Sequence, residues 1–117
     1  MTKRSYNKII RTVYNAVEKS GLTSRKFHDY WWEGVSSIIR TVNDALEPLS
    51  MQYNDYFTYS IEEVKGYSND GMTKTYNMEI CNRSGEKIIG GNIVCYTAGT
   101  IQDPWSSYDL TCTFWNI

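Results

Sequence analysis

The sequence predicts a single α+β domain, in which an N-terminal helical hairpin packs on one face of a four-stranded antiparallel β-meander (ααββββ). This prediction rests on two regions of the chain that differ in the spacing of their apolar residues. Up to about residue 47, apolar residues recur every three or four positions, which is the period of amphipathic helices. Beyond Pro48 the period becomes two, which is typical of half-buried strands. With 117 residues, 41% of them hydrophobic, the chain is expected to build one core.

The first predicted helix covers residues 5–20, and Gly21 is expected to supply the left-handed residue that ends many helices. Its apolar face carries Tyr6, Ile10, Val13 and Val17. Its opposite face carries a row of basic residues, namely Arg4, Lys8, Arg11 and Lys19. Helix surfaces often carry such residues in contact with water alone. The row nevertheless predicts a surface that binds phosphates or an acidic protein partner.

The second predicted helix covers residues 24–47. Thr23 is expected to be its N-cap, because the hydroxyl can accept a hydrogen bond from a first-turn N–H. Pro48 has no N–H and is expected to end the helix, whereas Gly34 is a point where it can kink. Two or three residues between the helices predict a helical hairpin. The apolar face consists of Phe27, Trp31, Val35, Ile38, Val42, Ala45 and Leu46; Trp32 lies off this face and is expected to be exposed or to contact the first helix.

Four strands are predicted at residues 53–65, 72–83, 86–98 and 107–116. Their registers follow from a two-residue turn at Ser84-Gly85, a symmetric loop around Asp103-Pro104 and a first loop at 66–71. The pairs predicted in this way are Arg83 with Glu86, Tyr76 with Ile93, Phe114 with Ile93, and Ile61 with Tyr76. The two registers that involve the third predicted strand both place Ile89, Ile93 and Cys95 on the helix-covered face, and the register of the first loop is consistent with this. Gly90 and Gly91 predict a bulge or a close approach of a helix.

The other face of the sheet is rich in Thr, Ser and Asn and carries little charge. An apolar group is expected at the end formed by the last two strands, and exposed groups of this kind indicate an interface. We therefore predict a partner-binding surface made of Ile88, Val94, Tyr96 and Trp115. The last strand is also predicted to be an open edge that another sheet can extend.

A search for catalytic chemistry finds little. His28 is the one histidine, so the sequence contains no two-histidine metal motif, and we expect neither a metal nor a cofactor. His28 and Asp29 are expected in the first turn of the second helix, where adjacent side chains point about 100° apart and form a poor acid–base pair. Two of the three cysteines, Cys81, Cys95 and Cys112, fall on the core face, where a thiol acts as a small hydrophobe. The protein is therefore predicted not to be an enzyme.

The net charge of −1 conceals a division between two segments. Residues 1–26 contain seven basic residues and only Glu18 as an acid, a net charge of +6. The remaining 91 residues contain five basic and twelve acidic residues, a net charge of −7. The sequence shows no apolar run long enough to span a membrane and no secretory signal, and its odd cysteine count forms no disulfide set, so a cytoplasmic protein without a membrane partner is predicted.

Three functions remain in view. The first is a small protein-binding module that acts on a protein partner or on itself as a homodimer. In size and in its Tyr/Asn/Thr-rich composition the chain resembles the small accessory proteins of phages and mobile elements, which include inhibitors of host defence, and this resemblance implies action in the host cytoplasm. The second is a nucleic-acid-binding module that uses the basic row. The third is a small-molecule binder or small enzyme with a pocket between helices and sheet.

Overall fold

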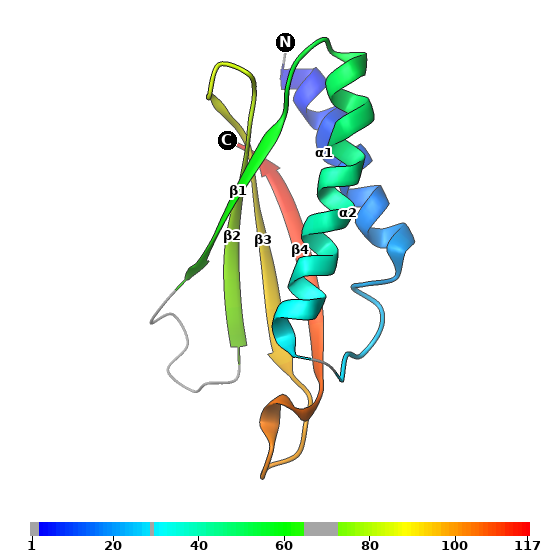
Figure 1. Cartoon of the computed structure of the whole chain (residues 1–117), viewed down its shortest axis with the longest axis vertical. Helices are drawn as coiled ribbons and strands as arrows, with labels where there is room; N and C mark the ends of the chain where they lie inside the picture. Colours follow the sequence, from blue (N-terminus) through cyan, green and yellow to red (C-terminus); the bar gives the residue numbers. More distant parts are fainter. Residues whose placement is uncertain (1–2, 29, 65–72) are drawn as a thin grey trace.

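The computed structural model describes residues 3–28, 30–64 and 73–117 and contains the predicted two layers (Figure 1). Both helices lie on one face of a single antiparallel sheet with strand order β1-β2-β3-β4. The ααββββ fold class is therefore confirmed. The elements are α1 (Lys3–Ser20), α2 (Trp31–Gln52), β1 (Thr58–Val64), β2 (Thr73–Cys81), β3 (Lys87–Thr97), a 3-10 turn η1 (Pro104–Ser106) and β4 (Tyr108–Asn116).

The core lies between the helices and the inner face of the sheet. Alternate residues of the strands point toward the helices, as the period of two predicts. The most deeply buried helical residues are Ile9, Val13 and Val17 of α1 and Val35, Ile38, Val42 and Leu46 of α2. They pack against Tyr76, Met78, Ile80, Ile89, Ile93, Cys95, Tyr108 and Leu110 of the sheet. The predicted inward positions of Ile89, Ile93 and Cys95 are therefore confirmed.

The predicted start of the second helix is wrong, because α2 begins at Trp31 rather than at residue 24. Phe27 is not helical; its backbone pairs with Tyr108 through two hydrogen bonds of 2.8 and 2.9 Å, and the two rings stack 5.2 Å apart. The connection from Gly21 therefore spans residues 21–30, and the Thr23 hydroxyl bonds Glu18 instead of capping a helix. This pairing also covers the start of β4, so the last strand is not a fully open edge.

Pro48 does not end α2, which continues to Gln52. Proline at this position removes the hydrogen bond to the carbonyl of Asp44, and both residues are on the exposed side of the helix, where water can replace that bond. Leu49, 4% exposed, anchors the extra turn in the core. Burial of this leucine therefore outweighs the local helix-breaking effect of the proline.

The first turn of α2 is fastened to β4 by a tyrosine hydroxyl. Tyr108 Oη accepts a hydrogen bond from Gly34 N at 3.1 Å and donates one to Tyr30 O at 2.9 Å. A Cβ at Gly34 would lie 2.9 Å from both Leu110 Cδ1 and Tyr108 Oη. Glycine at this position therefore permits a close approach of helix and strand.

The turn between β2 and β3 is longer than predicted. Asn82 N bonds Glu86 O, and Gly85 has a φ of 81°, so three residues rather than two form the loop. The predicted Arg83–Glu86 pair is therefore wrong. The predicted pairing of Tyr76 with Ile93 is confirmed, because a bulge restores the register: Cys81 pairs with Lys87 and Ile80 with Ile89, which leaves Ile88 as the extra residue.

The other two predicted registers are wrong by two residues. Ile93 pairs with Cys112 instead of Phe114, and Ile61 pairs with Met78 instead of Tyr76. An even shift keeps every side chain on its predicted face, which is why the core prediction survives. The shift in β4 places the Phe114 and Trp115 rings against Gly91 and Gly90, where added Cβ atoms would lie 2.9 and 2.4 Å from ring atoms. The glycines therefore make room for aromatic rings of a neighbouring strand, not for a helix.

Candidate interaction surfaces

The apolar group predicted on the outer face of the sheet is not one surface. Ile88 is 2% exposed and belongs to the core, because the bulge turns its side chain inward. Trp115 is 46% exposed but lies against Gly90, four residues from Val94 along β3, which is about 13 Å at 3.3 Å per residue. Of the four predicted residues, Val94 and Tyr96 alone lie together.

Val94 and Tyr96 line a groove of about 320 Å³ on the uncovered face of the sheet. The described side chains that line this outer-face groove are all uncharged; they are Val64, Thr73, Thr75, Asn77, Asn92, Val94 and Tyr96. Tyr96 is 43% exposed at its rim. At the adjoining strand, the Thr113 hydroxyl donates a 2.6 Å hydrogen bond to Asn92 Oδ1. The described part of this surface thus combines apolar side chains with uncharged hydrogen-bonding groups.

The basic row on α1 is solvent-exposed where the structure describes it, at Lys8, Arg11 and Lys19. The side chain of Arg4 lies outside the described part. Arg11 lines a groove of about 400 Å³ between α1 and β4, together with Asn7, Ile10, Tyr14, Thr113 and Phe114. Glu18 lies beside Tyr14 and raises the pKa of that phenol through its charge and a hydrogen bond. The Glu18 carboxylate therefore interrupts the basic surface near the C-terminal end of α1.

A third groove, of about 330 Å³, lies between the start of α2 and the β1 edge of the sheet. It is lined by Tyr30, Trp32, Ile61, Glu62, Glu63 and Tyr76. Trp32 is 41% exposed, in agreement with the first of its two predicted alternatives, and its ring meets the Tyr76 ring of the sheet at 5.7 Å. The sequence carried one signal of this site, the position of Trp32 off the apolar face of its helix.

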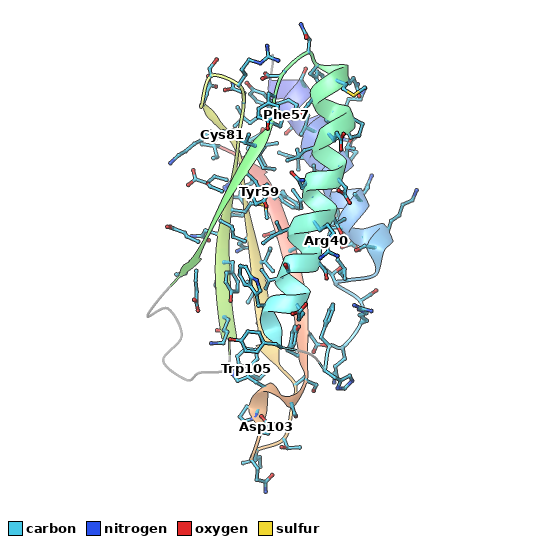
Figure 2. The ribbon with its side chains drawn as sticks, in the orientation of Figure 1. Arg40, Phe57, Tyr59, Cys81, Asp103 and Trp105 are labelled. Atoms are coloured by element: carbon cyan, nitrogen blue, oxygen red, sulfur yellow. The ribbon has the colours of Figure 1, made fainter. Side chains whose placement is uncertain are left out.

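Another hollow, of about 560 Å³, lies at the C-terminal end of α2 and is lined in part by Phe57, which is labelled in Figure 2. It contains Asp55, whose Oδ1 accepts hydrogen bonds from Arg83 N at 2.8 Å and Tyr56 N at 2.7 Å. These bonds favour the ionised carboxylate and lower the pKa of Asp55. The carboxylate ties the α2–β1 connection to the β2–β3 turn, which is a structural role.

Two of the three thiols are buried in the core. Burial raises the pKa of Cys95 and of Cys112 to about 12, which keeps both as neutral thiols at physiological pH. His28 is exposed in the connection before α2, not in its first turn as predicted, and Asp29 lies outside the described residues. Within residues 3–28, 30–64 and 73–117, no three His, Cys, Asp or Glu residues are grouped to hold a metal ion.

Neither α1 nor α2 combines the length and the apolar character that a membrane-crossing helix requires. Comparison of the chain with protein-family models, with curated proteins and with solved structures finds no match.

Proposed function

We propose that the protein is a small non-enzymatic protein-binding module that contacts its partner through the outer-face groove. The observation that supports this most strongly is the composition of that groove, whose described lining combines Val64, Val94 and Tyr96 with uncharged Thr and Asn side chains. The cores of protein interfaces are depleted in charged residues and enriched in tyrosine. A sheet face that no described element covers gives a partner access to the groove (Figure 1).

A second copy of the chain is the first partner to test, by size-exclusion chromatography with light scattering at low and high salt. We expect a dimer that persists at high salt, because an uncharged interface is insensitive to screening. Val94→Asp places a charge in the groove and should yield a folded monomer, as checked by circular dichroism. Thr58→Asp, on the same face but outside the groove, is the matched control and should remain dimeric.

A monomeric wild-type protein directs the test to a different protein partner. A photo-crosslinking residue at position 96 is then compared with the same residue at position 58 in cells of the source organism. The compositional resemblance to phage accessory proteins favours a host protein as the crosslinked species. Equal crosslinking from the two positions, together with a monomeric wild type, would overturn the proposal.

A nucleic-acid-binding function is the second candidate, supported by the exposure of Lys8, Arg11 and Lys19 on α1. The net charge of −7 over the rest of the chain opposes it, because an acidic body repels a polyanion. A short oligonucleotide added to the same column distinguishes the two functions. Co-elution that disappears as salt rises, and that Arg11→Ala weakens, would replace the first candidate by this one.

A further inference from the structure

The groove between α2 and the edge of the sheet exists because β1 diverges from the helix. Figure 1 shows β1 leaving α2 toward its Val64 end, opposite the start of the helix. Tyr30 and Trp32 line the groove from the helical side, and Ile61, Glu62, Glu63 and Tyr76 line it from the sheet. Its volume of about 330 Å³ is at the small end of the roughly 300–1,000 Å³ of ligand sites, so it suits a single side chain.

Aromatic rings form much of this groove. Tyr76 is 4% exposed and forms the floor, while Trp32 is 41% and Tyr30 61% exposed at the sides. The Trp32 ring meets the Tyr76 ring at 5.7 Å with an interplanar angle of 57°, so the two rings form a corner instead of a closed stack. Such rings carry negative charge on their faces and attract cations placed over them.

A carboxylate stands beside these rings. Glu63 is the cross-strand partner of Tyr76, which places both side chains on the helix-facing side of the sheet, and Glu62 also lines the groove. The ion pair between Lys87 and Glu79 does not involve these two glutamates. No basic side chain lines the groove in the described part of the chain.

Two basic residues of the described part of the chain lie over rings outside this groove. Arg25 lies 4.4 Å from the centre of the Phe27 ring, and Lys74 lies 5.4 Å from the centre of the Trp105 ring. Two N–H groups in the first turn of α2 already have acceptors: Gly34 N–H bonds Tyr108 Oη, and Glu33 N–H bonds Tyr30 O. These two groups therefore do not offset the negative charge of the carboxylates in the groove. The groove therefore combines aromatic faces with carboxylates.

We propose that this groove binds the arginine side chain of a basic segment in a protein partner. A guanidinium group is flat, stacks on aromatic rings and pairs with a carboxylate in one plane, and the corner of Trp32 and Tyr76 beside Glu63 offers both contacts. The site lies on the opposite side of the sheet from the outer-face groove. It therefore stands independently of the proposed function and adds a second contact of defined chemistry.

The test uses the full-length ¹⁵N-labelled protein and two short peptides, acetyl-Gly-Arg-Gly-amide and its citrulline analogue, which keeps the shape of arginine without the charge. The Trp32 indole N–H resonance, assigned with Trp32→Phe, reports binding. We expect millimolar affinity for the arginine peptide and roughly tenfold weaker binding of the citrulline peptide. A lysine peptide should bind more weakly than the arginine peptide, because an ammonium group does not stack.

Glu63→Gln retains the shape of the site and should weaken arginine binding about threefold, the effect of losing one exposed charge pair. Glu86→Gln, in the β2–β3 turn and away from the groove, is the matched control and should leave binding unchanged. The proposal is overturned by an absence of arginine binding, by equal binding of the citrulline peptide, by tighter binding of tetramethylammonium, or by resonance shifts confined to other surfaces. A Glu63→Gln protein with wild-type affinity would also overturn the assigned contact.

Discussion

On the face of the sheet that the helices cover, the half near β4 is covered more closely than the half near β1. On the β4 side, Tyr108 and Leu110 are at most 1% exposed, and Phe27 pairs with the edge of the strand. On the β1 side, the inward-facing Tyr59 is 37% exposed and Ile61 is only partly buried. Figure 2 shows Tyr59 on this less covered side. The helix-covered face therefore contains a tightly packed half near β4 and a looser half near β1 whose side chains are partly exposed.

The difference has a local cause in each half. Gly34 allows α2 to approach β4 so closely that Tyr108 bonds the first turn of the helix. Toward β1, the rings of Trp32 and Tyr76 occupy the space between α2 and the sheet and leave the third groove open. The close approach at Gly34 and the divergence of β1 thus together leave the β4 half of the sheet closed and the β1 half partly open.

The largest expected effect comes from deleting equivalent side-chain volume in the two halves. Leu110→Ala should lower the free energy of unfolding by about 2–5 kcal/mol, because it leaves a cavity in a fully buried site. Ile61→Ala should cost about 1 kcal/mol, because the site is partly open to water. Urea denaturation of both variants measures the two losses; equal losses would show that the β1 half is packed as tightly as the β4 half.

An intermediate effect is expected from removing one hydroxyl in each half. Tyr108→Phe leaves Gly34 N–H and Tyr30 C=O without this partner and should lower the free energy of unfolding by about 1–2 kcal/mol. Tyr59→Phe, at an exposed site, should change it by less than about 0.5 kcal/mol. The same denaturation experiment compares the two variants. An unchanged free energy of unfolding in Tyr108→Phe would show that the hydrogen bonds of the Tyr108 hydroxyl do not stabilise the contact between α2 and β4.

The smallest expected effect is a dependence of stability on pH that arises at Asp55, in the connection between α2 and β1. The Arg83 and Tyr56 N–H groups lower the pKa of Asp55, so its contribution to stability is present above the unfolded value of 3.8 and is lost as pH falls through the lower folded value. Asp55→Asn keeps an acceptor oxygen but removes the charge. The difference in melting temperature between wild type and variant should be constant from about pH 7 to pH 5 and shrink in stronger acid. A difference that stays constant in stronger acid would show that the charge is not involved.

Much of the fold was predictable because it depends on local periodicity. The period of two survives register errors of two residues, so the inward positions of Ile89, Ile93 and Cys95 were correct although Phe114 was paired wrongly. The candidate surfaces depended on the register itself and were less predictable. Placing Trp115 beside Val94 required the wrong pairing, and placing Ile88 outside required a regular strand where the structure has a bulge.

By itself, the sequence determined the ααββββ order, the inward face of each strand and the exposed basic residues of α1, because side-chain alternation and helical period are properties of neighbouring residues. The tertiary structure decided where α2 begins, because Phe27 pairs with a residue 81 positions later, at Tyr108. It also decided that α2 continues through Pro48, where burial of Leu49 outweighs a local preference. The groove of Tyr30, Trp32, Glu63 and Tyr76 joins three segments that meet only on folding, so no local pattern could have assembled it.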